Sequence, residues 1–218
     1  MKNPLKNLFF WRPYTTGQNK KYWRNRGDPE YWLEYAKTWN HPHRFIIASY
    51  LRQIDWGSLF EVGCGSGPNI INLARLFRGK QLGGIDINKT AIKVLNGLAK
   101  GGLFKVGSGE NIMMSDKSTD IVLSDAYLIY IDPRHIKKHL KEFKRIARKQ
   151  IILREYHSFS WIERQKLRIF SGRHAYDYKK LLEQLGFYDV QIYKLPPVEA
   201  DNEQKFRSLI VARTTLRV

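Results

Sequence analysis

The chain has 218 residues, enough for one domain with a sizeable hydrophobic core, and its 43% hydrophobic and 13% aromatic content excludes an intrinsically disordered chain. Its single cysteine excludes an internal disulfide framework and a cysteine-only zinc site. No apolar stretch has the length of a transmembrane helix or of a signal-peptide core. These observations predict a folded cytoplasmic protein.

The charge is strongly basic, with 38 Lys and Arg against 20 Asp and Glu and a formal net charge of +18. The excess lies in the two flanking thirds of the chain, whereas residues 61–130 are nearly neutral. A field of this sign attracts nucleic acid, phosphorylated metabolites, acidic glycans and anionic lipid headgroups. It is equally consistent with a basic proteome or with a need for solubility, so charge alone selects no partner.

Residues 1–44 are aromatic and basic, and we expect them to form a helical N-terminal extension. Asp28 and Pro29 are typical of a helix start, the first as cap and the second at the first helical position. Trp32 and Tyr35 then fall on one face of that helix. The pattern predicts a helical flap over a main domain at residues 45–218.

Strands and helices alternate through the first part of this main domain. A helix over 43–54, with Phe45, Ile46 and Tyr50 near one face, precedes the first strand. Strands are expected at 58–62, 81–87, 103–106 and 119–126, and helices at 69–77 and 89–100. This alternation predicts an α/β fold with a doubly wound, mostly parallel sheet.

The second half adds a basic amphipathic helix over 135–150 and a strand that begins at 150 and ends at 156. Residues 157–177 interrupt the rhythm and suggest a loop-like insertion that could act as a lid. A helix ending at Gly186 follows, and two last strands at 188–195 and 207–214 form a long hairpin. The sheet should therefore have seven strands and end with an antiparallel one.

The most informative stretch is the turn between the first strand and its helix, Glu61-x-Gly63-x-Gly65-x-Gly67. Backbone N–H groups and the positive end of a helix meet at such a turn and suit a polar or anionic ligand group. Pro68 stands where a dinucleotide fingerprint has its third glycine, which disfavours a nicotinamide cofactor. Glu61 would repel a pyrophosphate but pair with an ammonium group, and Asp86 ends the next strand, where a carboxylate accepts ribose hydroxyls.

An amino acid at one end and a nucleoside at the other describe S-adenosylmethionine, and from about residue 45 to 218 the sequence resembles the class I S-adenosylmethionine-dependent methyltransferases. "FEVGCGSG" and "GIDIN" resemble their first two motifs, and "GSGENI" and "STDIVLSDAYLIYI" the next two. The likeness is closest to small single-domain members that act on metabolites, lipids and sugars. It implies a Rossmann-like sheet and S-adenosylmethionine as cofactor.

The resemblance also assigns cofactor-binding roles. These fall on Glu61, Gly63, Cys64, Gly65, Gly67, Asp86, Ile87, Ser108, Gly109, Glu110 and Ser124. At the position of Ser108 the family usually has an acid that accepts the adenine amino group. Either Ser108 or Glu110 would take that role here.

Methyl transfer from a sulfonium needs alignment of donor and acceptor, and a base where the acceptor carries a proton, but no metal. Candidates to face the sulfonium are Asp125, Tyr127 and Tyr130 after the fourth strand and Glu155, Tyr156 and His157 after the fifth. His157 is the best general base by its usual pKa. Its structural alternative is a histidine that packs in the core.

Three functions fit the sequence. The first is a methyltransferase acting on oxygen or nitrogen of an anionic small molecule, glycan or lipid precursor. The second is an RNA methyltransferase that docks through its basic flanks, although the motifs of base-amino and pyrimidine-C5 methylation are absent. The third is a catalytically silent methyltransferase-like binding protein.

Overall fold

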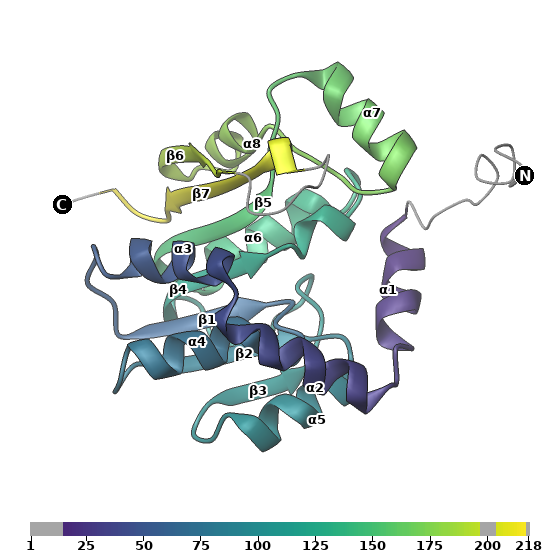
Figure 1. The fold of residues 1–218 in the computed structure, drawn as a ribbon. Helices are drawn as coiled ribbons and strands as arrows, with labels where there is room; N and C mark the ends of the chain where they lie inside the picture. The colour runs from purple at the N-terminus through teal and green to yellow at the C-terminus, as the bar shows by residue number, and fades with distance from the viewer. Residues whose placement is uncertain (1–14, 197–203, 217–218) are drawn as a thin grey trace, which may run out of the picture.

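The computed structural model describes residues 15–196 and 204–216. A single sheet runs through the molecule in the order β3-β2-β1-β4-β5-β7-β6 (Figure 1). Its strands are β1 Ser58–Val62, β2 Gln81–Asp86, β3 Leu103–Val106, β4 Thr119–Asp125, β5 Ala147–Tyr156, β6 Tyr188–Lys194 and β7 Arg207–Arg213. β7 is antiparallel to both of its neighbours, and the pairs among β1 to β5 are parallel. The predicted doubly wound, seven-stranded sheet with an antiparallel last strand is confirmed.

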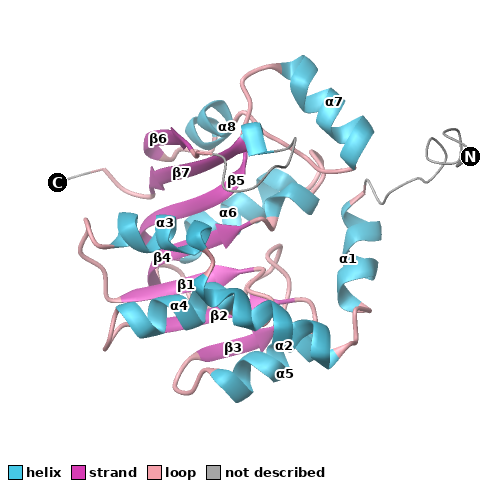
Figure 2. Cartoon of the chain, viewed as in Figure 1, coloured by secondary structure: helices cyan, strands magenta, loops and turns pink. Residues whose placement is uncertain are grey.

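Helices cover both faces of the sheet (Figure 2). They are α1 Thr16–Arg24, α2 Pro29–Lys37, α3 Pro42–Leu51, α4 Pro68–Leu76, α5 Lys89–Leu98, α6 Ile136–Ile146, α7 Trp161–Ser171 and α8 Tyr178–Gln184. Short 3₁₀ turns occur at Thr38–Asn40, Leu128–Tyr130 and Gln204–Phe206.

The core consists of two apolar layers, one on each face of the sheet. α3, α4 and α5 pack on one face, and α6 and α8 pack on the other. Neighbouring residues of β4 serve opposite layers: Ile121 and Leu123 face the first, and Val122 faces the second. Both faces of the central strands are therefore buried, which explains their continuous apolar runs.

α3 buries a different face from the one that its apolar pattern predicts. Phe45 is exposed, whereas Ile47 and Leu51 enter the core together with Arg44. Arg44 can be buried because its guanidinium donates to the Thr38 carbonyl and to Asn69 Oδ1. Arg44 is therefore buried, with its guanidinium hydrogen-bonded, on a face of α3 that the apolar pattern did not predict to be buried.

The N-terminal segment forms the expected helices where it is described. Asp28 caps α2 by accepting a hydrogen bond from the Glu30 N–H, and Pro29 is the first helical residue. α1 lies beside the carboxyl edge of the sheet, at the side of the molecule where α7 also projects (Figure 1). The division into an extension at 1–44 and a domain at 45–218 stays a prediction, and residues 1–14 lie outside the described part.

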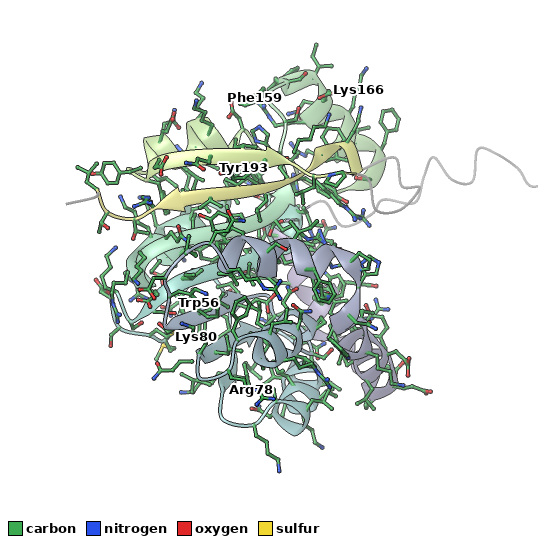
Figure 3. All side chains as sticks on the ribbon, turned by 60° about the vertical axis from the view of Figure 1, so that its left-hand side comes forward. Trp56, Arg78, Lys80, Phe159, Lys166 and Tyr193 are labelled. Atoms are coloured by element: carbon green, nitrogen blue, oxygen red, sulfur yellow. The ribbon has the colours of Figure 1, made fainter. Side chains whose placement is uncertain are left out.

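The insertion after β5 contains a regular helix, α7, where the sequence suggests a loop. Ser160 caps its start by accepting from the Glu163 N–H, and Gly172 ends it in the left-handed conformation. Figure 3 shows Phe159 and Lys166 of this segment at the opposite end of the view from Arg78. The helix escapes the pattern because only Leu167 of its residues is buried.

Candidate active site

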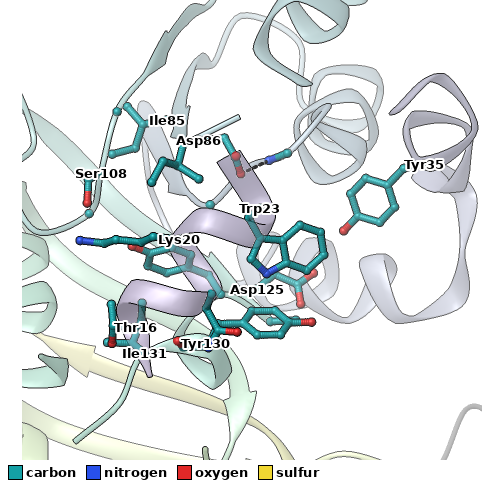
Figure 4. Close-up of a pocket in the computed structure, with 18 of the residues that line it drawn as sticks. Thr16, Lys20, Trp23, Tyr35, Ile85, Asp86, Ser108, Asp125, Tyr130 and Ile131 are labelled. Carbon is teal, nitrogen blue, oxygen red and sulfur yellow. Dashed lines mark hydrogen bonds between the residues drawn. The ribbon is translucent and has the colours of Figure 1, made fainter. Parts of the chain in front are cut away.

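A cavity of about 280 Å³ lies at the carboxyl edge of the sheet, between the ends of β1, β2 and β4 and the helices α1 and α2 (Figure 4). We call α1 and α2 the roof, and the strand ends with their following loops the floor. The floor contributes Gly63, Gly65, Ile85, Asp86, Ile87, Gly107, Ser108, Gly109, Asp125, Ala126, Tyr127, Tyr130 and Ile131. The roof contributes Thr16, Asn19, Lys20, Trp23, Tyr31, Trp32 and Tyr35.

The glycine turn at residues 63–67, here the cofactor loop, has a backbone that only glycine adopts easily. Gly63, Gly65 and Gly67 have φ angles of 77°, 53° and 78°, all in the left-handed region. A Cβ on Gly63 would lie 2.5 Å from Cδ2 of Tyr127. The N–H groups of Gly63 and Cys64 both donate to the Ile85 carbonyl, which ties the loop to β2.

Asp86, at the end of β2, connects the cofactor loop to the start of α5. Its Oδ2 accepts a hydrogen bond from the Gly65 N–H at 2.9 Å. Dashed lines mark hydrogen bonds of this kind in Figure 4. Its Oδ1 accepts from the Asn88 N–H at 2.8 Å. Burial raises the pKa of Asp86, and these backbone hydrogen bonds act against that rise. The carboxylate is thus held rigidly while it faces the cavity.

Glu61 lies behind the cofactor loop and is only 2% exposed. Its Oε1 accepts from Asn69 Nδ2 at 2.7 Å, and its Oε2 has no hydrogen-bond partner among the described residues. Burial raises the pKa of Glu61 to about 8. An unpartnered buried carboxylate oxygen is costly, so Glu61 is suited to accept from a donor that a bound molecule brings.

A buried ion cluster stands beside Glu61 at the end of β4. Asp125 lies 3.0 Å from Arg154 Nε and 3.5 Å from Arg44 Nη1, and it accepts from Asn69 Nδ2 at 2.9 Å. Burial alone would raise the pKa of Asp125, but the two arginines outweigh it and hold the pKa below its usual value. Asp125 therefore faces the cavity as a carboxylate.

Arg44, Asn69 and Arg154 belong to this site, although the sequence did not predict a role there for any of them. Arg154 gave a usable signal, since it is a basic residue that directly follows the apolar run Ile151–Leu153 in the buried part of β5. Arg44 and Asn69 gave none, because each sits in an ordinary amphipathic helix.

Glu155 is a fully buried carboxylate that organises the loop after β4. Its Oε1 accepts from Ser124 Oγ and from the N–H groups of Tyr127 and Leu128, and its Oε2 accepts from the Ile129 N–H. Burial raises the pKa of Glu155 to about 7. Its four acceptor contacts are inside the protein, so it shapes the cavity wall from behind.

Tyr127 lines the cavity with its ring, while its hydroxyl points to a second buried network. The hydroxyl lies 3.0 Å from Nδ1 of His139, whose Nε2 is 3.3 Å from Oε1 of Glu110. Glu110 Oε2 pairs in turn with Lys20 of α1 at 2.8 Å. Burial lowers the pKa of His139 to about 4, so the ring is neutral at pH 7.

Polar contacts to both sides of the floor fix α1 in the roof. The Thr16 N–H donates to Asp132 Oδ2, and the Asp132 N–H donates to Thr16 Oγ1. Asn19 Nδ2 donates to the Tyr130 carbonyl, and Asn88 Nδ2 donates to the carbonyls of Trp23 and Arg26. α1 therefore bridges the loops that follow β4 and β2, directly across the cavity.

The structure brings nine of the predicted site residues to the cavity lining: Gly63, Gly65, Asp86, Ile87, Ser108, Gly109, Asp125, Tyr127 and Tyr130. Glu61, Cys64, Gly67, Glu110 and Ser124 lie next to these residues but outside the lining. The Cys64 thiol is buried toward β2, where a Cβ on Gly84 would lie 3.0 Å from its Sγ. Of the two residues predicted for the adenine amino group, Ser108 lines the cavity, whereas Glu110 pairs with Lys20 and lies 3.3 Å from His139 Nε2.

His157 is placed away from the cavity. Its Nδ1 accepts from the Tyr178 N–H at 3.3 Å, and its own N–H donates to the Phe206 carbonyl. Phe159 packs on its ring edge to face, and burial lowers the pKa of His157. His157 therefore packs against the start of α8, as expected for a histidine with a structural role in the core.

Comparisons with known proteins agree with this arrangement. Residues 59–150 match a family model described as a methyltransferase domain. The range includes the cofactor loop, Asp86, Ser108 and the loop after β4. Residues 59–150 thus form a methyltransferase domain, in agreement with the predicted resemblance to the class I S-adenosylmethionine-dependent methyltransferases. A search of curated proteins found no match.

Solved structures match the fold of this methyltransferase at low sequence identity. The partner of the Trm112 methyltransferase activator in a Haloferax volcanii complex is 15% identical, with a TM-score of 0.68 over 87% of this chain and 96% of that one. A Methanosarcina mazei S-adenosylmethionine-dependent methyltransferase is 21% identical, with a TM-score of 0.60 over 79% and 98%. The phosphoethanolamine N-methyltransferase 2 of Haemonchus contortus, solved with S-adenosylhomocysteine, is 13% identical, with a TM-score of 0.62 over 79% and 52%.

The residues of the floor fit S-adenosylmethionine. Gly65 of the cofactor loop lines the cavity, and a Cβ there would lie 3.1 Å from the Tyr35 ring of the roof, so the glycine keeps this part of the floor open. Glu61 has a free acceptor for an ammonium group, and Asp86 offers a fixed carboxylate for ribose hydroxyls. When bound, this cofactor supplies an electrophilic methyl group on a sulfonium.

Proposed function

We propose that the methyltransferase acts on oxygen or nitrogen of an anionic small molecule, glycan or lipid precursor. The main support for this proposal is that the roof encloses the cavity. Aromatic side chains of α1 and α2 (Trp23, Tyr31, Trp32 and Tyr35) close over the cavity, so an acceptor must enter as a small or slender group. A nucleic-acid duplex does not fit such an enclosure.

Basic residues near the opening support an anionic acceptor. A depression outside the roof shares Tyr31 with the cavity and is lined by Lys21 and Arg26. The Arg26 guanidinium lies 3.6 Å from the centre of the Tyr31 ring. Cations held at an opening raise the local concentration of anions there.

The titration of the lining residues favours alignment over proton removal. Burial raises the pKa of Tyr127 and Tyr130, while the two arginines keep that of Asp125 low. None of these three groups is a good base at neutral pH. An oxyanion or a neutral amine needs no base for an in-line displacement, which agrees with the proposed acceptor class.

We assign the cofactor contacts to Gly63, Gly65, Asp86, Ser108 and Gly109, with Glu61 behind the loop. Tyr130 and Asp125 would face the acceptor. Tyr127 would position the floor through its ring under the cofactor loop. His157 is not part of this proposal, because it lies outside the cavity lining.

The test is transfer of a radiolabelled methyl group from S-adenosylmethionine to lipid, metabolite and total RNA extracts. We expect label in the lipid or metabolite fraction, with about ten- to hundred-fold less from the variant Asp86→Ala at a subsaturating cofactor concentration. Label only in RNA, with binding that weakens steeply as salt rises, would instead support the RNA alternative.

A further inference from the structure

The outer face of α7 is the most exposed apolar surface of the described chain that the active site does not use. It consists of Phe159, Trp161, Ile162 and Phe170, which are 66%, 66%, 60% and 82% exposed. Scattered apolar residues on a surface need no explanation, but four large ones on one capped helix and its approach do. We keep the name outer face for these residues together with Lys166 and Arg168.

This helix is rigidly built and not a frayed segment. Ser160 and Gly172 cap its two ends. Arg164 donates to the carbonyls of Ser158 and Phe159, which fixes the approach to the helix. Its inner side buries Leu167 in a cluster with Ile129 and Tyr156. The apolar side chains on the other side are therefore held outward by a stable scaffold.

The net charge around this face is positive. Residues 157–176 contain four basic side chains and one acid, Glu163. Glu163 pairs with Lys205 at 3.3 Å and also attracts Lys166, and one acid against four basic side chains leaves the segment positive. Figure 3 shows Lys166 on the periphery of the molecule near Phe159. An occupant of this face must accept both apolar side chains and positive charge.

We propose that the outer face of α7 docks on an anionic lipid bilayer surface. Helices that combine Trp, Phe and aliphatic residues with Lys and Arg lie in the membrane interface, where the apolar groups enter the acyl boundary and the cations meet headgroups. RNA would not account for the exposed Ile162, which cannot stack. A second copy of this chain would bring a net charge of +18 against +18.

The position of α7 gives the docking a consequence for the active site. The cluster that buries Leu167 includes Ile129 and packs against Tyr130, and Tyr130 lines the cavity. Docking through α7 would therefore bring the wall of the cavity that contains Tyr130 close to the lipid surface. The inference goes beyond the proposed function and holds whichever acceptor is methylated.

The test is co-sedimentation of the full chain with vesicles of phosphatidylcholine alone or of phosphatidylcholine with phosphatidylglycerol. We expect binding to the anionic vesicles, decreasing as salt rises, and little binding to the neutral ones. Ile162→Ser and Phe170→Ser should each weaken binding about ten-fold or more, since each removes a side chain worth about 1.5–3 kcal/mol when buried.

Matched controls come from α5 and the turn that follows it, on the far edge of the sheet. Leu98→Ser removes a 50% exposed leucine there and should leave vesicle binding unchanged. Lys166→Glu with Arg168→Glu should abolish the preference for anionic vesicles. Lys93→Glu with Lys100→Glu makes the same change in net charge on exposed residues and should retain most of it.

Three results would overturn the proposal. The first is no binding to anionic vesicles, and the second is equal binding by Phe170→Ser and Leu98→Ser. The third is that replacing Ile162 and Phe170 abolishes self-association or RNA binding but leaves vesicle binding unchanged. Calorimetry measures the affinity of each variant for S-adenosylhomocysteine. Since α7 lies outside the cavity lining, an unchanged affinity shows that the variant is folded and that its loss of vesicle binding is a separate effect.

Discussion

The floor and the roof of the cavity are built in different ways. In the floor, each functional group is fixed by a backbone conformation or by backbone hydrogen bonds, as in the cofactor loop and at Asp86. In the roof, α1 is held by a few side-chain contacts such as that of Asn19 with the Tyr130 carbonyl and that of Lys20 with Glu110. Changes in the floor should therefore have large effects on stability and cofactor binding, and changes in the roof small ones.

The largest effect should come from Gly63→Ala. A left-handed alanine costs about 1–2 kcal/mol, and the overlap with the Tyr127 ring adds about 1–3 kcal/mol. Urea unfolding measures the loss in free energy, and calorimetry with S-adenosylhomocysteine measures the accompanying loss in affinity. Gly79 has the same φ of 77° with open space around it, so Gly79→Ala should show the conformational cost alone. Equal losses at both glycines would refute a tightly packed floor.

Asp86→Ala should be next in size. Loss of a charged hydrogen-bonding partner of the ribose costs about 1–3 kcal/mol of cofactor affinity, roughly a ten- to hundred-fold change. Calorimetry with S-adenosylhomocysteine provides the measurement. Asp116→Ala, which removes an exposed carboxylate paired with Arg145, is the control and should leave affinity unchanged. An unchanged affinity in Asp86→Ala would place the ribose elsewhere.

The buried carboxylates of the floor predict the pH dependence of stability. Glu61 has a pKa of about 8 in the folded chain against a usual value of 4.5, so between these values the folded state retains a proton that the unfolded state releases. The free energy of unfolding should fall as pH rises through this window, by at most about 1.4 kcal/mol per pH unit for this group. Glu155 acts in the same direction up to about pH 7.

The measurement is urea unfolding across this pH range, with and without Glu61→Gln. The variant should flatten the dependence, most visibly between pH 7 and 8, where Glu155 no longer contributes. Glu34→Gln, at an exposed carboxylate, should keep the original slope. A slope that is the same in Glu61→Gln and the unaltered chain would contradict the burial argument.

The smallest effect is expected in the roof, from Lys20→Met. The Lys20–Glu110 pair is partly exposed, and such pairs contribute about 1 kcal/mol or less. We expect cofactor affinity to fall by no more than about five-fold, with faster dissociation of S-adenosylhomocysteine in stopped-flow measurements. Lys37→Met removes a fully exposed pair with Glu34 and should change neither quantity. A loss as large as that of Asp86→Ala would mean that roof and floor act as one unit.

The same contrast explains what could be predicted from the sequence. The floor depends on local chemistry: a glycine turn after a buried strand and an acid at the end of the next one. Such features are written in consecutive residues, and they predicted both the sheet and the position of Asp86. The roof depends on pairs far apart in the chain, such as Thr16 with Asp132, 116 positions away. No pattern in either segment indicates the other.

Residues after β5 show a second limit. The sequence placed Glu155 and His157 at the correct edge of the sheet, but not the direction of their side chains. Glu155 turns inward because four donors of β4 and its following loop surround it. At His157 the chain pairs with Tyr176, which keeps the imidazole near Tyr178. Both orientations depend on neighbours that fold in from elsewhere.

The buried Cys64 gives this methyltransferase a built-in reporter of local motion. It is the single thiol of the chain, it sits within the cofactor loop, and burial raises its pKa well above the usual value. A thiol reagent can modify it only while the loop is open, since the reactive thiolate must first reach solvent. The rate of labelling therefore measures how often the loop opens. Any ligand that holds the loop closed should slow that rate, and no engineered cysteine is needed to observe it.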